Sequence, residues 1–461
     1  MSAGLREALA CAGFAAAFLL LFFAGEVLRR VCRWNPEATR KTVHLAGCLI
    51  AMLFPVFLRS AWSVPALTAA FALVLLAAQR RHWLHAINDV ERFSLGGVTH
   101  PLAIFVCFFF AARLGRPVFY EIAMLVLAFS DSSAALAGMA YGRSRYRVEG
   151  DSLKSVEGSA IFFLSTFLVV EIVLLLATAL SRLDCILLAL LIALLVTIFE
   201  AISLCGTDNL FVPLGTVFLL AKNAEPSTAE LVFQFGALAA SFAAAALIAH
   251  PYRKISRPGL LAVGLGIYAA WGLLDFPWAL PLLAALALVC RTDWVLPEPG
   301  DGEDAARVRI AFYLVLVPAL WILVANLAWK LSGRDLRPLF YPGFLAAIAA
   351  QLLLSRWKNR SAAGTRDAIP RLPADALLLW AGLHAAGFFV FGAARLAEWA
   401  AGGGLALAVV LSVAALYRPL LHRWEEASEV WFPRIRLFLL LPLTGLANAA
   451  MFFACGRRFW P

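Results

Sequence analysis

Charged residues are scarce in this sequence. They make up only 15% of its 461 residues, whereas 62% are hydrophobic, and the chain contains 35 Phe and 14 Trp. Soluble globular domains carry about 25% charged residues, so the composition excludes an ordinary soluble protein. It predicts an all-α, polytopic integral membrane protein.

Cysteine motifs and nucleic-acid motifs are also missing. The eight cysteines are scattered, mostly in apolar runs, with no CxxC motif and no Cys/His group at zinc-site spacing, so we interpret them as small hydrophobic residues. No basic stripe with interleaved aromatic residues indicates DNA or RNA, and nucleic acid is therefore not an expected partner. The formal net charge of +10 instead resides in short clusters between apolar runs, which is typical of cytoplasmic loops beside anionic lipid headgroups.

Apolar runs recur along the whole sequence. A helix that crosses the membrane at a right angle needs about 20 residues, and roughly 14–16 spanning helices are expected here. In the first part of the chain the runs lie near residues 8–28, 43–58, 62–78, 101–113, 118–142, 158–180, 183–202, 210–221 and 231–249. The first run has no basic segment before it, so it is interpreted as a retained span and not as a cleaved signal.

The character of the sequence changes after residue 257. Further apolar runs lie near residues 260–274, 276–290, 310–330, 338–355, 374–395, 401–417 and 437–455. We therefore expect two membrane units, residues 1–257 and 258–461. The acidic stretch at 297–307 and the basic stretch at 356–366 are interpreted as solvated connectors. No convincing internal repeat relates the two units, which weakens an inverted-repeat transporter as an interpretation.

The basic residues predict an orientation in the membrane. With the N-terminus outside, the strongly basic loops all fall on the cytoplasmic side, and they carry Arg29, Arg30, Arg33, Arg40, Lys41, Arg80, Arg81, Arg143, Arg145, Arg147, Lys154, Arg253, Lys254 and Arg257. The alternate loops carry few basic residues, so the positive-inside rule favours this orientation. The polar motifs that follow are then expected to face the cytoplasm, where nucleotides are available.

The segment FSDSSAALAGMAYGR at residues 129–143 places an acid and small residues in an apolar run. On a helix, one face of this segment carries Asp131, Ala134, Ala135, Gly138 and Gly142. Small residues alone are typical of helix packing in membranes, and that interpretation stays open for the glycines. An acid at this position is costly and usually functional. Gly142 and the following Arg143 suit the close approach of a phosphate.

The next loop leads into LKSVEGSA at residues 153–160. Lys154 offers a flexible positive charge to a phosphate, and Ser155 offers a hydroxyl. Glu157, just before Gly158, is an acid that can hold Mg²⁺. The alternative is an ordinary helix cap, which would explain both Ser155 and Glu157.

A third polar segment is FEAISLCGTDNLFVP at residues 199–213. Glu200 ends one apolar run, and Asp208 and Asn209 lie in the turn before the next. Mg²⁺ prefers oxygen ligands and is usually shared with substrate phosphates, so these three residues and Asp131 are candidate ligands. The alternative is a polar turn that caps a helix.

A fourth segment, TRKTVHLAG at residues 39–47, begins another apolar run with Arg40, Lys41 and His44. The two basic residues can hold a nucleotide phosphate, and His44 can transfer protons near neutral pH. The alternative is that His44 is simply an interfacial residue. Glu171 is an acid inside an apolar run without an obvious partner, and it either lines a cavity for a lipid alcohol or neutralises a buried arginine.

The order of these segments resembles the dolichol kinase and phytol kinase family, CTP-using integral membrane kinases of isoprenoid alcohols that are distantly related to phosphatidate cytidylyltransferases. The resemblance covers roughly the first half of the chain and rests on RKTVH, DSSAALAGMAYGR, LKSVEGS, and Glu200 with GTDNLFVP. It implies a nucleotide and metal site made of Asp131, Gly138, Gly142, Lys154, Glu157, Gly158, Glu200, Asp208 and Asn209, with Arg40, Lys41 and His44 nearby. The part after residue 258 has no counterpart in the short phytol kinase pattern, and the extra spans of dolichol kinases precede this core.

We therefore expect an enzyme that phosphorylates a membrane-embedded isoprenoid alcohol, such as phytol, geranylgeraniol, dolichol or another polyprenol. CTP is the expected donor, and Mg²⁺ is the expected cofactor. The expected catalytic residues are Asp131, Lys154, Glu157 and His44. The expected nucleotide-binding residues are Arg40, Lys41, Gly138, Gly142, Arg143, Lys154, Ser155 and Gly158. The expected metal ligands are Asp208, Asn209, Glu200 and Asp131.

Three other functions fit parts of the same pattern. A cytidylyltransferase or a diacylglycerol kinase would need a similar nucleotide site, and a transporter of an anionic or lipid substrate would place acids along its pathway. The acids here cluster with a basic loop at one membrane face, which favours an enzyme. Several choices stay open at this point: the alcohol, the donor (CTP or ATP), the oligomeric state and the role of residues 258–461. The division of the carboxylates into a base and metal ligands is open as well.

Overall fold

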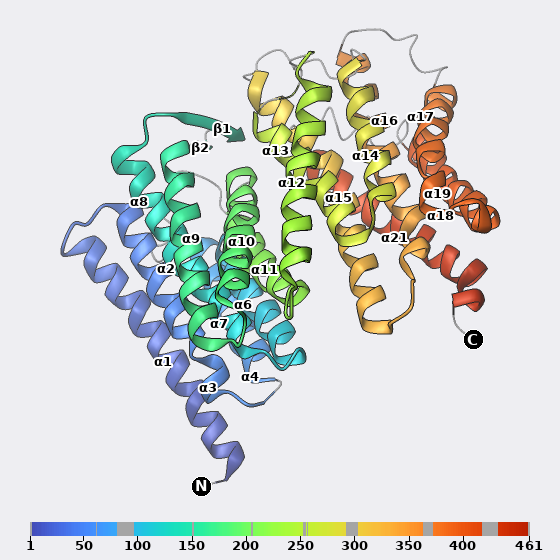
Figure 1. The fold of residues 1–461 in the computed structure, drawn as a ribbon. Helices are drawn as coiled ribbons and strands as arrows, with labels where there is room; N and C mark the ends of the chain where they lie inside the picture. The colour runs from blue at the N-terminus through green and yellow to red at the C-terminus, as the bar shows by residue number, and fades with distance from the viewer. Residues whose placement is uncertain are drawn as a thin grey trace. The chain divides into compact units, whose positions relative to one another are not determined.

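The computed structural model describes residues 2–60, 62–80, 96–149, 152–203, 206–251, 255, 257–291, 303–362, 372–416 and 432–459. Within these ranges the regular secondary structure is helical apart from one short β-hairpin (Figure 1). Nine helices of the described ranges are long and apolar enough to cross a membrane, and six more are apolar but shorter. The predicted all-α polytopic membrane fold is therefore confirmed.

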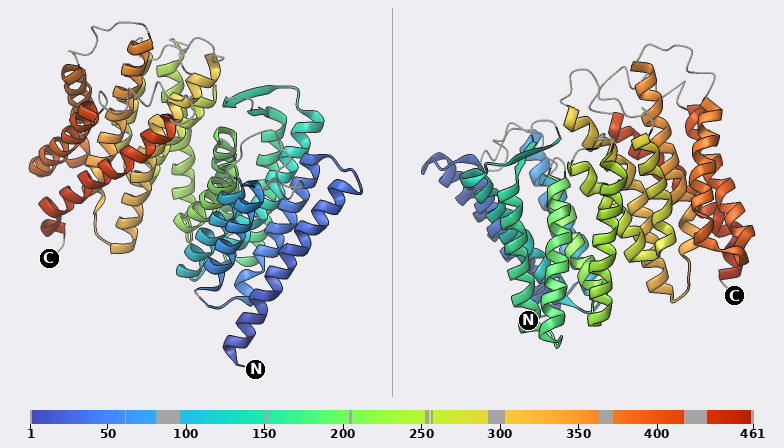
Figure 2. Two further views of the ribbon diagram at one scale, coloured as in Figure 1. Left: turned by 180° about the vertical axis from the view of Figure 1, so that it is seen from behind. Right: turned by 45° about the horizontal axis from the view of Figure 1, so that its top comes forward.

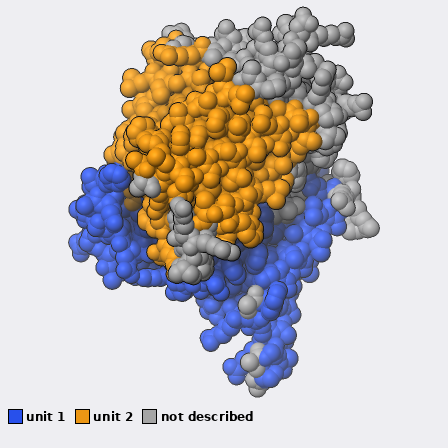
Figure 3. Space-filling view, turned by 90° about the vertical axis from the view of Figure 1, so that its right-hand side faces the viewer, with its two compact units in different colours: residues 1–233 blue, residues 234–461 orange. Residues whose placement is uncertain are grey.

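The chain divides into two compact units, residues 1–233 and 234–461, which Figure 3 shows in different colours. The division falls inside one helix, α12 (Thr228–Ala249). The expected boundary between residues 257 and 258 was drawn from a change in sequence character, and it stays a prediction about where the kinase-like part ends.

Unit 1 is a bundle whose helices run side by side in both views of Figure 2. Its elements before α12 are α1 (Ala3–Arg30), α2 (Pro36–Met52), α3 (Phe54–Phe57), α4 (Ser63–Arg80), α6 (Gly96–Arg113), α7 (Pro117–Leu125), the π-helix η1 (Val126–Ser130), α8 (Asp131–Tyr141), β1 (Arg145–Glu149), β2 (Ser152–Ser155), α9 (Val156–Ala177), α10 (Arg182–Ile202) and α11 (Asp208–Lys222).

Helix α2 begins where the sequence provides a cap. Asn35 accepts a hydrogen bond from the backbone N–H of Glu37 at 2.9 Å, and Pro36 takes the first helical position. Proline is favoured there because that N–H has no partner within the helix. The cap fixes the first turns of α2, which carry the RKTVH segment.

A π-helix interrupts the span formed by α7, η1 and α8. The five residues of η1 are followed directly by Asp131, the first residue of α8, and η1 packs against α2, α9 and α11. Short π-helical segments inside α-helices are frequent at functional sites. Here the segment places Asp131 among helices from three distant parts of the sequence.

Helices α8 and α9 are joined by the β-hairpin. Strands β1 and β2 pair antiparallel, with Arg145 opposite Ser155 and Tyr146 opposite Lys154. Ser155 then caps α9 by accepting a hydrogen bond from the N–H of Gly158 at 3.1 Å. The hairpin thus determines the position from which Lys154 extends.

The faces of unit 1 suit a lipid environment. Along α10 most side chains are buried, whereas α9 is apolar on all sides and exposes Leu176 at 82% and Ile172 at 52%. A helix that is apolar all round is either buried in protein or in contact with lipid. Helix α9 therefore forms part of the lipid-facing surface.

Unit 2 is a second helical bundle. After the end of α12 its elements are α13 (Arg257–Ala269), the π-helix η2 (Ala270–Leu274), α14 (Phe276–Arg291), α15 (Glu303–Ser332), η3 (Arg337–Phe340), α16 (Tyr341–Ala362), α17 (Leu372–Ala386), α18 (Phe388–Phe391), η5 (Ala393–Arg395), α19 (Leu396–Leu416) and α21 (Phe432–Phe459). Helix α16 is central, because it contacts α14, α15, α17, α19 and α21.

The two expected connectors of unit 2 are partly helical. Residues 303–307 of the acidic stretch belong to α15, and residues 356–362 of the basic stretch belong to α16, while their interpretation as solvated connectors stays a prediction. Both segments contain strong helix formers such as Ala and Arg, which let a helix continue beyond its apolar run. Residues 297–302 and 363–366 lie outside the described residues.

Candidate active site

A buried ion pair joins two of the predicted segments. Lys41, in the second turn of α2, donates hydrogen bonds to both carboxylate oxygens of Asp131, each at 2.7 Å. The two side chains are only 8% and 10% exposed. Removing one partner of such a pair leaves a buried charge uncompensated, so the two residues depend on each other.

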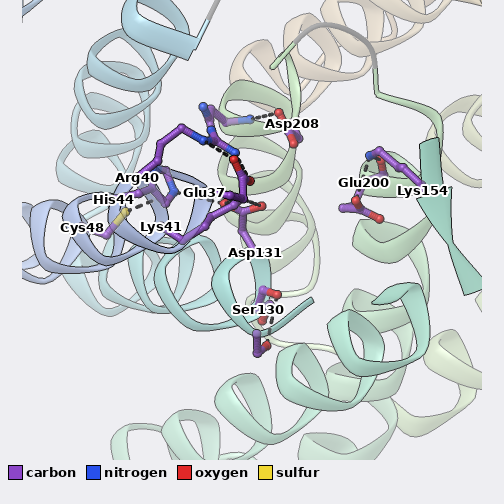
Figure 4. Close-up of polar contacts among 12 residues, drawn as sticks. Glu37, Arg40, Lys41, His44, Cys48, Ser130, Asp131, Lys154, Glu200 and Asp208 are labelled. Atoms are coloured by element: carbon purple, nitrogen blue, oxygen red, sulfur yellow. Dashed lines mark hydrogen bonds and ion pairs between the residues drawn. The ribbon is translucent and has the colours of Figure 1, made fainter. Parts of the chain in front are cut away.

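Two neighbours on α2 complete this group (Figure 4). The Nε2 atom of His44 lies 3.4 Å from Oδ2 of Asp131. Arg40 binds Glu37 through two hydrogen bonds of 3.0 and 2.5 Å. Because Lys41 and His44 are three residues apart, they share one helix face. The structure therefore brings Lys41 and His44 to Asp131, which follows Lys41 by 90 residues in the sequence.

A second buried ion pair joins two other predicted segments. Lys154 in β2 binds Oε1 of Glu200, near the end of α10, at 2.8 Å and also donates to the main-chain oxygen of Glu200. Burial lowers the pKa of Lys154, but the negative charges of Glu200 and Asp208 outweigh it and raise the pKa above its ordinary value. Lys154 is therefore a cation at neutral pH.

Glu200 keeps one oxygen unused. Its Oε2 atom is buried and has no hydrogen-bond partner among the described residues. A buried oxygen without a partner costs about 1–3 kcal/mol. This atom is therefore available to a metal ion or to a bound ligand.

Asp208 lies within electrostatic reach of both groups. It is the first residue of α11 and accepts a hydrogen bond from the backbone N–H of Asn209 at 3.1 Å. Its charge acts on Arg40 in the first group and on Lys154 in the second. The turn before it contains Gly206, whose positive φ of 81° suits glycine, and whose carbonyl accepts a hydrogen bond from Thr99 at 3.0 Å.

The oxygen donors of these groups fit a Mg²⁺ ion by chemical type. Glu200 and Asp208 supply carboxylates, and Asn209 supplies an amide oxygen. The free Oε2 of Glu200 is the observation that favours this set. Asp131, in contrast, uses both oxygens to bind Lys41. Its predicted role as a metal ligand therefore has weaker support than that of Glu200.

The predicted glycines lie in a tight contact between α8 and α9. A Cβ atom on Gly138 would lie 3.0 Å from Oγ of Ser155, and one on Gly158 would lie 3.0 Å from both that atom and the carbonyl oxygen of Ala134. The packing interpretation of the glycines and the capping interpretation of Ser155 thus both describe the structure. Their predicted role in nucleotide binding stays a prediction.

Replacing Gly142 with alanine is expected to lower the free energy of unfolding by about 1–3 kcal/mol, because overpacked contacts cost that much. Its Cβ would lie 2.9 Å from Cβ of Ser155. The measurement is thermal or denaturant unfolding of the purified protein in detergent. Gly13→Ala is the control, since a Cβ there meets no atom within 4 Å. Equal stability of the two variants would contradict the tight contact.

Glu157 and Arg143 occupy more exposed positions than the two lysines. The carboxylate of Glu157 accepts hydrogen bonds from the backbone N–H of Ser144 at 3.0 and 3.3 Å, and Arg143 is exposed. Among the described residues Glu157 is therefore engaged by the loop between α8 and β1 and not by Lys154. Its predicted catalytic role stays a prediction.

Two residues of this region had no predicted role. Cys48 on α2 and His100 on α6 lie beside His44, and one ligand atom from each of the three residues lies within 4.8 Å of the others. The spacing of His44 and Cys48, four residues apart, could have indicated a shared helix face. His100 is far away in sequence and gave no signal. Cys48 is wholly buried, as its interpretation as a small hydrophobic residue leads one to expect, and its sulfur also lies in this cluster.

Glu171 lies on α9, and its Oε2 atom is buried without a partner among the described residues. No described arginine neutralises it. Its predicted place in a cavity for a lipid alcohol stays a prediction.

The chain is similar to a phytol kinase from Synechocystis sp. (strain ATCC 27184 / PCC 6803 / Kazusa). The two sequences are 34% identical over 215 residues, which is 45% of this chain and 88% of that relative. No family model and no solved structure matches the chain. The similarity concerns the phytol kinase part of the resemblance described above, and the dolichol kinase part stays a prediction.

Proposed function

The chain belongs to the phytol kinase family and is a lipid-alcohol kinase, and we propose that it transfers the γ-phosphoryl group of CTP to the terminal hydroxyl of an isoprenoid alcohol held in the bilayer. The observation that carries the proposal is the pair of buried lysine–carboxylate contacts, Lys41 with Asp131 and Lys154 with Glu200. Both occur in unit 1: Lys41 lies near the start of α2, Glu200 lies near the end of α10, and Asp131 lies within the span formed by α7, η1 and α8.

These ion pairs suit a ligand that carries both signs of charge. A triphosphate with its bound cation offers anionic oxygens to the lysines and a positive centre to the carboxylates. When the ligand binds, each lysine can exchange its carboxylate for a phosphate oxygen, and each carboxylate can exchange its lysine for the cation. No buried charge is then left uncompensated. In the free protein the pairs hold the four side chains in place for that exchange.

We assign the triphosphate to Lys154, Arg40 and Lys41. Lys154 is protonated because Glu200 and Asp208 keep its pKa high, and Arg40 is already oriented by Glu37. Catalysis of phosphoryl transfer consists mainly of positioning and of neutralising charge on the phosphate oxygens. Mg²⁺, when bound, would supply part of that neutralisation, and Glu200, Asp208 and Asn209 would hold it.

Asp131 is the residue assigned to accept the proton of the alcohol. The hydroxyl oxygen of the lipid forms a bond to the γ-phosphorus, the bond between that phosphorus and the β-γ bridging oxygen breaks, and CDP leaves. The hydroxyl proton passes to a carboxylate oxygen of Asp131. Before the nucleotide binds, Lys41 and His44 lie against that carboxylate, and Lys41 holds it in position.

The proposed location of the reaction is the cytoplasmic face of the membrane. The basic loops and the ends of α8, α10 and α2 lie on the same side of the predicted topology. A soluble nucleotide can reach this side, and the hydroxyl of a lipid alcohol resides at the interface. The N-terminus would then lie outside.

The experiment that tests the proposal incubates the purified protein with γ-labelled CTP or ATP and a set of alcohols: phytol, geranylgeraniol, longer polyprenols and diacylglycerol. We expect label in the monophosphate of an isoprenoid alcohol, with CTP as the better donor. Label in phosphatidate alone would contradict the proposed acceptor. Equal or better use of ATP would contradict the proposed donor.

A further inference from the structure

His44, Cys48 and His100 form a buried cluster beside the Lys41–Asp131 pair. Their ligand atoms all lie within 4.8 Å of one another. From this geometry we propose that the three residues bind one zinc-like transition-metal ion, at a site separate from the oxygen ligands of Glu200 and Asp208.

The helices place the three side chains correctly for a common ion. His44 and Cys48 are four residues apart on α2 and so share one helix face. The Nε2 atom of His44 lies 3.8 Å from Sγ of Cys48. Sulfur and nitrogen ligands of a tetrahedral zinc ion lie about 3.6 Å apart, given their usual bond lengths. His100 enters from α6, with its ring centre 4.7 Å from that of His44.

The donor set selects the class of metal. Two imidazoles and a thiolate are borderline-soft ligands that suit Zn²⁺, whereas Mg²⁺ prefers oxygen. Three protein ligands are the number found in zinc sites that keep one position open. Cys48 is wholly buried, so its sulfur faces the protein interior and not the lipid.

An unsatisfied atom in the cluster points to a ligand. The Nδ1 atom of His100 is buried and has no hydrogen-bond partner among the described residues. Such an atom costs about 1–3 kcal/mol, and an ion bound at Nδ1 would give it a partner. The cluster therefore has both the geometry and the reason to bind a metal.

The ion would change what His44 can do. The same Nε2 atom that faces Cys48 lies 3.4 Å from Oδ2 of Asp131. An ion bound at Nε2 occupies the lone pair of that nitrogen, so His44 cannot accept a proton there. The metal instead links α2 to α6 and leaves Asp131 to Lys41. This assignment replaces proton transfer by His44 with a positioning role.

The experiment measures metal content without any substrate. The full chain is purified in detergent without a histidine tag, and bound zinc is measured by mass spectrometry. Zinc is then replaced by Co²⁺, whose thiolate charge-transfer absorption reports a cysteine ligand. The variants are Cys48→Ser and His100→Ala. Cys185→Ser is the matched control, because Cys185 is equally buried but lies on α10.

We expect about one zinc ion per chain in the wild type and in Cys185→Ser. Cys48→Ser and His100→Ala should bind zinc at least about tenfold more weakly, and Cys48→Ser should lack the thiolate absorption. If His100→Ala does not fold, the zinc content of Cys48→Ser alone tests the site, since this variant exchanges a single atom. A wild type without zinc or thiolate absorption, or equal zinc in all variants, would overturn the site. Either result leaves the kinase proposal untouched, because no phosphoryl transfer is measured.

Discussion

Asp131→Asn is expected to lower the rate of lipid phosphorylation by about 10²–10⁴-fold, the usual contribution of a general base. The amide cannot accept the proton of the alcohol. It also leaves the ammonium of Lys41 buried without its counter-charge, which costs about 3–5 kcal/mol of stability. The measurements are the initial rate with γ-labelled nucleotide and the unfolding temperature in detergent.

A double variant separates the two effects of Asp131→Asn. Lys41→Met combined with Asp131→Asn removes both charges, and replacing a buried pair by uncharged groups is often neutral for stability. We expect it to regain stability without regaining activity. Glu225→Gln is the control, since its ion pair with Arg116 is exposed and worth at most about 1 kcal/mol. Near-normal turnover in Asp131→Asn would remove this residue from the mechanism.

Lys154→Met is expected to reduce kcat/KM for the nucleotide by about 10²–10³-fold, the loss seen when one preorganised charge contact to the transition state is removed. Lys154 is held by Glu200 and keeps its proton because its pKa is raised. The variant also leaves the carboxylate of Glu200 without its cation. Steady-state kinetics with varied nucleotide gives the measurement.

A neighbouring charge provides the control for Lys154→Met. Arg145 lies in the same hairpin, opposite Ser155, and is exposed. Arg145→Met removes one positive charge from the same loop and should leave kcat/KM within about twofold of wild type, as expected for a solvated charge. Equal losses in the two variants would indicate a general effect of loop charge and not a specific role of Lys154.

The sequence was sufficient to predict the fold class and to single out the segments that carry the two buried ion pairs. Composition and run length depend only on local chemistry, which is why the all-α membrane fold followed from them. The acids Asp131 and Glu200 were recognisable because a carboxylate in an apolar run is costly and usually has a function. Both now lie in buried ion pairs of unit 1.

The pairing of these residues could not be predicted from the sequence. Lys41 binds Asp131 across 90 residues, and Lys154 binds Glu200 across 46, so the partners are decided by tertiary packing. Tertiary packing also decides the contacts of two further residues, whose predicted site roles stay predictions. Ser155 caps α9, and the carboxylate of Glu157 binds the backbone at Ser144.

The cluster with Cys48 and His100 was missed for a physical reason. Only His44 and Cys48 are neighbours on one helix, and the third residue comes from α6, more than fifty positions later. A helix periodicity rule detects contacts within a helix and none between helices. The π-helix before Asp131 could not be predicted from the sequence either, because its residues are as apolar as those of the α-helices beside it.

The most direct test of the proposed phosphoryl transfer compares CTP labelled in the α-phosphate with CTP labelled in the γ-phosphate, using purified protein and phytol in lipid vesicles. We expect label from the γ position alone to enter the lipid, as phytyl monophosphate, with one CDP released for each lipid product. Label from the α position in the lipid, accompanied by pyrophosphate, would show cytidylyl transfer and would contradict it.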